Sequence, residues 1–219
     1  MQIRDATEDD LPGILAIYNR VIATSNAVYT ETAATLDDRR AWFAARRADN
    51  FPVLVADDAG IMGFASFGDF RPWPGYALTV EHSVYVHEVA HRQGVGTALV
   101  RCLIVEAQRR SKHVMIGGID AANVASIGMH RKLGFTEAGS LREVARKFGR
   151  WLDLVLMQEL DSNLNNPDDR KMVTISKFQP FRQARFNLRQ ARIAISCPGI
   201  EISTRDPGNA KVMGHVELF

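Results

Sequence analysis

Two glycines separated by one residue stand at the start of an apolar helical pattern, in the stretch HRQGVGTALV (91–100). Gly94 and Gly96 leave backbone N–H groups uncovered where a strand passes into a helix, and such groups can hold an anion such as a pyrophosphate. A phosphate loop needs Lys at Thr97, and a dinucleotide fingerprint needs a third glycine at Leu99, so both motifs are excluded. From this motif alone, a plain tight turn into a helix explains the glycines as well as anion binding does.

The elements that must position these glycines are predicted by hydrophobic periodicity, which indicates a mixed α/β domain. Thr7 and Asp10 resemble a capping box before the first helix. The loop FRPWPG (70–75) is predicted to be rigid, because its two prolines fix φ and exclude a helix. Helices are predicted at 11–22, 36–48, 95–110 and 125–133, and strands from Ile3 and at 52–57, 61–69, 76–86, 113–119, 141–148 and 151–160, with 52–57 and 61–69 forming a hairpin.

Composition limits the classes of protein to which the chain can belong. Its 219 residues are 46% hydrophobic and 24% charged, which allows one full core with a small appendage. The formal net charge of +2 does not point to nucleic acid or to a membrane surface. The acidic N-terminal residues do not resemble a signal peptide, and no apolar run is long enough to span a membrane, so we expect a cytoplasmic protein. Cys102 and Cys197 have no metal-binding spacing and fit a reducing compartment, with Cys102 in the core and no metal required.

The composition changes after residue 160, which divides the chain into a predicted domain at 1–160 and a linker with a basic tail at 161–219. The segment DSNLNNPDD is polar and turn-rich, and residues 170–192 contain seven Lys or Arg and no Asp or Glu. At helical spacing the apolar side chains of this segment share one face. The tail is therefore either a basic amphipathic helix for an anionic partner, or a solvated, partly disordered or non-native extension.

The glycine loop and three further separated motifs carry a resemblance to a known family. The glycine loop followed by a helix, together with VEHSVYV (80–86), IDAANVASIGMHRKLGF (119–135) and KFGRWLDLVLMQ (147–158), resembles the GNAT superfamily of acetyl-CoA-dependent N-acetyltransferases. Within it, residues 2–160 are most similar to the phosphinothricin acetyltransferase branch and to its relatives that acetylate methionine sulfoximine and methionine sulfone. The resemblance implies a mostly antiparallel central sheet flanked by helices and splayed between its two central strands, a homodimer, and a role in detoxifying such antimetabolites. His91 departs from the Gln or Arg that the family usually has there, which puts the affinity for CoA in question.

The family's chemistry assigns catalytic roles to two side chains. Acetyl transfer needs a neutral amine, a polarised carbonyl and a proton for the leaving thiolate. Glu81 is the candidate base, since partial burial in its strand would raise its pKa, although a solvent-facing Glu is the alternative that position alone favours. His130 lies where many relatives have a Tyr that protonates the CoA sulfur, so it is expected to act as that acid or to pair with Glu81. A single helix histidine is otherwise more often structural.

The resemblance also implies binding residues. The strand before the glycine loop offers main-chain groups to the pantetheine arm, the loop holds the pyrophosphate, and an Asn reaches the pantetheine amides. An Arg of the proline-rich loop clamps the acceptor carboxylate beside an aromatic wall. The cofactor residues are Val84, Tyr85, Val86, Arg92, Gln93, Gly94, Val95, Gly96, Thr97 and Asn123; the acceptor residues are Arg71, Pro72, Trp73, Glu81, His82 and Ser83, with Tyr29 and Glu31 closing the pocket and Lys147 and Arg150 at a dimer edge.

Two classes of function remain open at this level. The first is an N-acetyltransferase that acetylates the α-amino group of small amino-acid analogues by direct attack in a ternary complex, with methionine sulfoximine or sulfone favoured over phosphinothricin. A protein N-terminus or a polyamine is an alternative acceptor within this class. The second is a non-catalytic acyl-CoA sensor whose tail docks on a partner.

Overall fold

Seven strands form a single sheet in the computed structural model, which describes residues 1–161. The predicted linker, basic tail and amphipathic helix, and Cys197, lie outside the described residues, and the domain boundary at residue 160 stays a prediction. The strands are β1 (Gln2–Asp5), β2 (Val53–Asp57), β3 (Ile61–Asp69), β4 (Thr79–Val86), β5 (Val114–Asp120), β6 (Thr136–Lys147) and β7 (Arg150–Leu160); the helices are α1 (Leu11–Thr24), α2 (Leu36–Ala48), α3 (Val95–Arg109) and α4 (Val124–Lys132).

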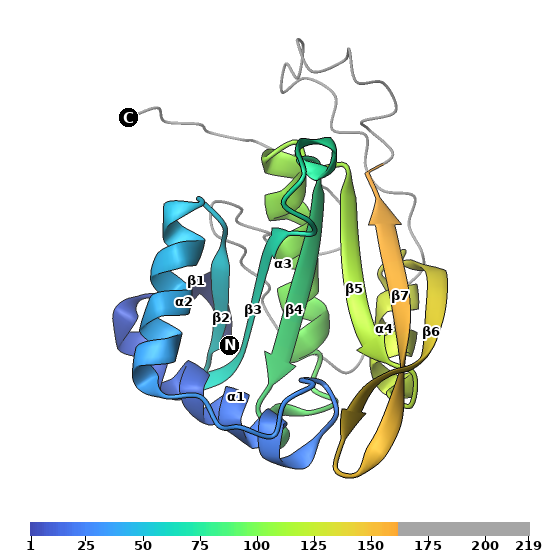
Figure 1. The fold of residues 1–219 in the computed structure, drawn as a ribbon. Helices are drawn as coiled ribbons and strands as arrows, with labels where there is room; N and C mark the ends of the chain where they lie inside the picture. Colours follow the sequence, from blue (N-terminus) through green and yellow to red (C-terminus); the bar gives the residue numbers. More distant parts are fainter. Residues whose placement is uncertain (162–219) are drawn as a thin grey trace, which may run out of the picture.

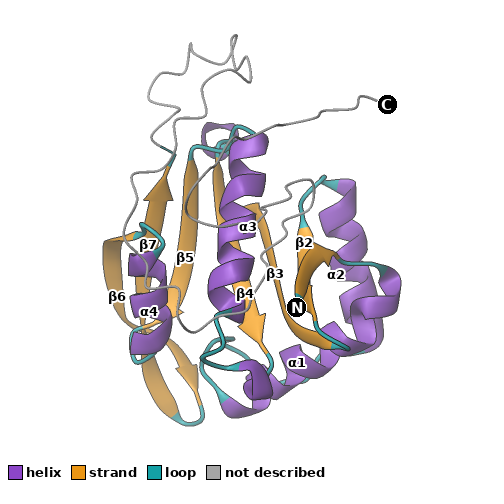
Figure 2. Cartoon of the chain, turned by 180° about the vertical axis from the view of Figure 1, so that it is seen from behind, coloured by secondary structure: helices purple, strands orange, loops and turns teal. Residues whose placement is uncertain are grey.

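The sheet order is β1-β2-β3-β4-β5-β7-β6, and every neighbouring pair is antiparallel except β4 and β5. Figure 1 shows α1 and α2 in front of the sheet, and Figure 2, seen from behind, shows α3 and α4 across the other face. Successive side chains of a strand point to opposite faces of the sheet, so apolar residues contribute to a hydrophobic core on each face. In β3, Phe64 packs with α1 and α2, whereas Ala65 and Phe67 pack with α3.

The parallel strands β4 and β5 separate partway along their length. They pair only from Thr79 opposite Val114 to His82 opposite Gly117. Beyond this point β4 continues to pair with β3, and β5 continues to pair with β7, so the edges that β4 and β5 turn toward each other carry unpaired main-chain groups. The mixed fold and the predicted splay between two central strands are therefore confirmed.

Several local predictions are confirmed as well. The helix predicted at 36–48 has these bounds, and its N-cap Thr35 exchanges hydrogen bonds with Asp38. Asp10 accepts a hydrogen bond from the backbone N–H of Thr7 at 2.7 Å, as expected for the first capping box. Cys102 lies on the inner face of α3 and is fully buried in the core. Within residues 1–161, no helix combines the length and the apolar character that a membrane crossing requires.

Two predictions about the last strands are wrong. Strand β6 begins at Thr136 instead of residue 141, because pairing with β7 imposes extended backbone on a segment without a strand pattern, and its register slips at two points. Lys147 does not lie at an exposed dimer edge. Its side chain is buried, and Nζ donates hydrogen bonds to the backbone oxygens of Ile22, Ser25 and Val28 at 2.6–2.8 Å. Arg150, at the start of β7, is exposed.

Candidate functional site

The glycine loop ends at the N-terminus of α3. Gly94 is the N-cap and has φ +84°, a left-handed conformation that favours glycine. The backbone N–H of Ala98 bonds to the oxygen of Gly94 at 2.9 Å, so the N–H groups of Val95, Gly96 and Thr97 have no acceptor within the helix. Free N–H groups and the positive end of the helix dipole together attract an anion.

Gly96 also has a packing role at the start of α3. A β-carbon on Gly96 would lie 3.3 Å from Sδ of Met129 and 3.4 Å from Cγ2 of Val86. The missing side chain therefore lets the first turn of α3 pack between α4 and the end of β4.

The rest of the loop is exposed and is tied to β4. Nε2 of His91 lies 3.1 Å from the backbone oxygen of Val86, and the side-chain amide of Gln93 donates to the oxygen of Val89 at 2.7 Å. Arg92 has φ +61° and an exposed side chain. The unusual His91 thus fixes the loop to the end of β4 without occupying the N-terminus of α3.

A small cavity of about 90 Å³ opens where β4 and β5 separate. Ser83, Val84 and Tyr85 of β4 line it together with Asn123, so these predicted residues do come together. Val86 and residues 92–97 are outside its lining and follow at the C-terminal end of β4. The side-chain oxygen of Asn123 accepts the N–H of Ser126 at 3.1 Å and caps α4, which fixes the side chain at the edge of the cavity.

Two buried histidines, His82 and His130, also line this cavity. Nδ1 of His130 is 2.8 Å from the backbone oxygen of Ser126, which can only accept, so Nδ1 carries the proton. Nε2 of His130 then accepts from Nε2 of His82, 3.2 Å away, and the two rings stack with centroids 5.0 Å apart. Burial lowers the pKa of both imidazoles, that of His82 to about 3, so both are neutral.

This arrangement corrects the expected role of His130. Its ring contacts His82 on the α4 side of the sheet, and a β-carbon on Gly117 would meet both rings, whereas one on Gly118 would meet Glu81. Neighbouring strand residues point to opposite faces, so the side chains of Glu81 and His82 leave the sheet on opposite sides. The hypothesis that His130 pairs with Glu81 is wrong, and the only ring proton of neutral His130 is held by Ser126.

We predict that acid destabilises the fold through this histidine pair. The pKa of His82 is 6.5 without the fold and about 3 within it, so between these values the unfolded chain binds a proton that the folded chain does not. Stability present above pH 6.5 is therefore lost as the pH falls, by about 1.4 kcal/mol per pH unit for His82. Urea unfolding from pH 7.5 to 5 measures this slope. The slope should flatten in His82→Gln but not in a variant of the exposed His91, and equal slopes in all three proteins would contradict the prediction.

Glu81 occupies the opposite, open face of the sheet. Its side chain is half-buried, and burial raises the pKa of the carboxyl group while the nearby Arg71 acts in the lowering direction. Oε1 would lie 3.3 Å from a β-carbon on Gly118, so this exposed glycine keeps the space beside the carboxylate open. Sequence reasoning missed Gly118, although a glycine inside a strand pattern signals close approach of another group.

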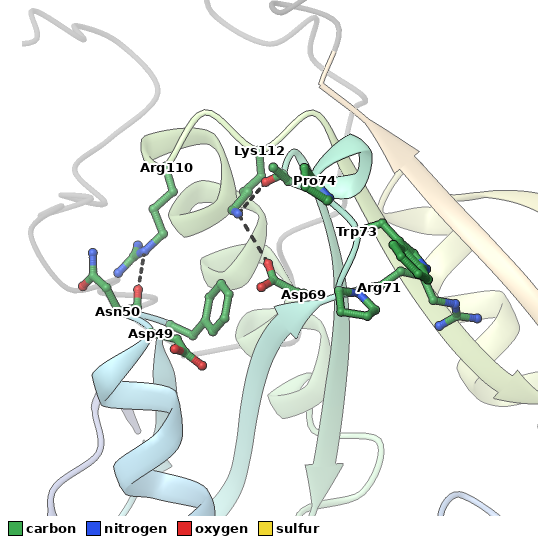
Figure 3. A pocket seen from close by; sticks show the side chains of 11 residues that line it. Asp49, Asn50, Asp69, Arg71, Trp73, Pro74, Arg110 and Lys112 are labelled. Carbon is green, nitrogen blue, oxygen red and sulfur yellow. Dashed lines mark hydrogen bonds and ion pairs between the residues drawn. The ribbon is translucent and has the colours of Figure 1, made fainter.

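The proline-rich loop carries Arg71, whose charge acts on Glu81. Residues 71–74 of this loop border a second cavity of about 460 Å³, which Glu81 does not line, at the end of the sheet far from the glycine loop. In Figure 3, Arg71 and Trp73 point away from the ion pair of Lys112 and Asp69. Nη1 of Arg71 donates to the oxygen of Phe70 at 2.8 Å, and the guanidinium stacks on the Phe70 ring. Trp73 is 69% exposed, so Arg71, Pro72 and Trp73 form one accessible group near Glu81.

The loop before α2 closes the other side only in part. The hydroxyl of Tyr29 is 3.5 Å from the backbone oxygen of Asp153 at the open end of the splay. Glu31 accepts the N–H of Phe148 at 2.9 Å and is therefore committed to the β6–β7 turn. Among residues 1–161, no group of three or more His, Cys, Asp or Glu side chains is arranged to hold a metal ion.

Comparisons with known proteins agree with this geometry. The model of the acetyltransferase (GNAT) family matches residues 14–135. An L-methionine sulfoximine/L-methionine sulfone acetyltransferase from Pseudomonas paraeruginosa is 48% identical over 75% of this chain and 98% of its own length. A phosphinothricin N-acetyltransferase from Alcaligenes faecalis is 39% identical over 71% of this chain and 80% of its own.

Solved structures show the same fold. A ribosomal-protein-alanine N-acetyltransferase from Brucella melitensis superposes with a TM-score of 0.73 at 48% identity, covering 74% of this chain and all of that one. An acetyltransferase from Salmonella typhimurium, solved with its cofactor acetyl-CoA, gives 0.71 at 45% identity over 72% of this chain and 92% of its own. The chain therefore belongs to the GNAT family of acetyltransferases, and it is an N-acetyltransferase.

Proposed function

We propose that the protein transfers the acetyl group of acetyl-CoA to the α-amino group of small amino-acid analogues. Methionine sulfoximine and methionine sulfone are the preferred acceptors, followed by phosphinothricin-like compounds, and the amine attacks the thioester directly in a ternary complex. The names of the relatives support this acceptor class. The observation that carries the proposal is a half-buried carboxylate, Glu81, beside an open glycine and near an accessible Arg71.

Acetyl-CoA would bind along the splay. The N–H groups of Val95, Gly96 and Thr97 suit the pyrophosphate, because they lack helical acceptors and lie at the positive end of α3. The unpaired edge of β4 from Val84 to Val86 suits the pantetheine arm, which can add to it as a strand does. Asn123 lines the same cavity and would contact the same arm. The acetyl carbonyl then lies where β4 and β5 part.

Glu81 would act as the base that makes the amine nucleophilic. An α-ammonium group near pKa 8 must lose a proton before it attacks, and a carboxylate with a raised pKa is a better proton acceptor. A backbone N–H of the β4 edge would hold the carbonyl oxygen as negative charge develops. We assign His130 a positioning role: it orients His82 at the cleft, since its own proton is bonded to Ser126.

The acceptor's α-carboxylate would bind Arg71, with Pro72 and Trp73 as an apolar wall. Replacing Arg71 by Met should raise KM for methionine sulfone by about 10²–10³-fold, because a charged, bidentate contact is lost. KM for acetyl-CoA should stay unchanged. A thiol-release assay measures both constants, and Arg101→Met on the exposed surface of α3 is the matched control.

A protein N-terminus is the second candidate acceptor, because the Brucella structure carries the name of a ribosomal-protein-alanine N-acetyltransferase. A peptide that begins with Ala has no free carboxylate next to its amine. Turnover of such a peptide that survives Arg71→Met, with no turnover of methionine sulfone by the unmodified protein, would replace the proposed acceptor class.

The homodimer expected from the family is also a proposal. Exposed apolar side chains along β6, β7 and their turn support it, since they form a row that a second subunit would cover: Leu141, Val144, Phe148 and Trp151, the last 62% exposed. The cytoplasmic location stays a prediction.

A further inference from the structure

Arg46 of α2 crosses over the sheet and fills the place of a missing side chain. A β-carbon on Gly68 of β3 would lie 2.6 Å from Cζ of Arg46 and still closer to Nη1. A side chain at Gly68 would therefore have to displace this guanidinium. Its partner in the β3–β4 register is Glu81.

This register places Arg46 on the same face of the sheet as the proposed base. Side chains of directly opposite residues in an antiparallel pair point to the same side, with β-carbons about 4.5–5.5 Å apart. Nη1 of Arg46 is consequently within roughly 7 Å of the β-carbon of Glu81. The carboxylate itself lies beside Gly118 of β5, whereas the guanidinium lies over Gly68 of β3, so the two groups flank β4 on the same face of the sheet.

The guanidinium has hydrogen-bonding capacity that the described part of the chain does not use. Nε is buried and has no partner among residues 1–161. The terminal nitrogens make no hydrogen bond to a described residue and are not among the buried unpartnered atoms, so they are accessible. Asp49 and Asp69 act on Arg46 only through space, and the Phe51 ring lies 5.8 Å away. A half-buried cation with unmade bonds favours an incoming oxygen acceptor.

We propose that Arg46 is a specificity residue that binds the side-chain oxygens of the acceptor, those of a sulfone, sulfoximine or phosphinate group. The inference rests on the proposed function, in which the acceptor amine lies at Glu81 and the α-carboxylate at Arg71. The two guanidinium groups then hold the two oxygen-bearing ends of the acceptor. A thioether side chain offers only a weak acceptor, so Arg46 selects the oxidised analogue over methionine.

Replacing Arg46 by Met tests the assignment with two acceptors that differ only at sulfur. The value of kcat/KM for methionine sulfone should fall by about 10–100-fold, the loss typical of a hydrogen bond to a charged group. The value for methionine should change less than about threefold, because no such bond is lost. Arg46→Lys should retain part of the selectivity, since Lys keeps the charge but not the planar fork. Arg47→Met is the matched control, one position along α2 and exposed.

Gly68→Ala provides an independent variant that keeps the charge. The added methyl group must displace the guanidinium, so selectivity for the sulfone should fall as it does in Arg46→Met, with KM for acetyl-CoA unchanged. Equal losses for methionine and methionine sulfone in both variants would overturn the inference and leave the proposed function standing. Absence of turnover of both acceptors by the unmodified protein would instead overturn the proposed function, and the inference with it.

Discussion

Replacing Glu81 by Gln should lower kcat by about 10²–10⁴-fold while the affinity for acetyl-CoA is retained. The amide has nearly the shape of the carboxylate but cannot take a proton, so the acceptor remains in its unreactive ammonium form. Steady-state thiol release measures kcat, and calorimetry measures binding of acetyl-CoA. A non-catalytic sensor would show no thiol release before the substitution.

The pH profile gives a second readout of the same residue. Burial raises the pKa of Glu81, and a base works only when it is deprotonated, so kcat/KM should fall as the pH drops through this raised value. Arg71 opposes the shift, so Arg71→Met should move the acidic limb to still higher pH. The limb should disappear in Glu81→Gln.

Glu159→Gln is the matched control, because burial also raises the pKa of this half-buried carboxyl group on β7. Its pH profile should equal that of the unmodified protein. A Glu81→Gln variant with near-normal kcat, or one whose acidic limb persists, would remove Glu81 from the proposed chemistry.

Replacing Lys147 by Met should lower the free energy of unfolding by roughly 3 kcal/mol or more. The ammonium group bonds to three backbone oxygens where α1 ends and the following loop begins, where helix carbonyls lack donor partners within the helix. Methionine fills a similar volume but removes the donor from all three carbonyls, of which that of Ile22 is buried and those of Ser25 and Val28 are part-buried. For a chain of this size the midpoint of thermal unfolding should drop by about 10 °C.

Urea and thermal unfolding measure this effect, and Lys132→Met on the exposed surface of α4 serves as the control. The control should stay within about 0.5 kcal/mol of the unmodified protein. Equal stability of the two variants would mean that water satisfies the three carbonyls and that Lys147 does not anchor α1 to β6.

Sequence patterns predicted the elements whose signals are local. The helix at 36–48 has both a capping box and apolar residues at helical spacing. Residues 52–69 form two strand-like segments joined by a turn. Interactions between near neighbours in the sequence therefore determine both elements. The glycine loop was recognised because a helix N-terminus is itself a local feature. The separation of Glu81 from His82 was also available in the sequence, since adjacent strand residues must face opposite sides.

Other features depend on residues that only the fold brings together. His82 and His130 are 48 positions apart, Lys147 bonds to carbonyls about 120 positions earlier, and Arg46 covers Gly68 from another element. Sequence periodicity does not predict these contacts, because each depends on how whole helices pack across the sheet. The first residues of β6 are extended because they pair with β7, and this pairing outweighs their weak local preference for a strand. The sequence by itself therefore determined the elements, the family and the candidate base, through interactions between near neighbours. Only the tertiary structure decided which polar groups are buried, which are paired and which remain free for a ligand, because burial depends on contacts between distant segments.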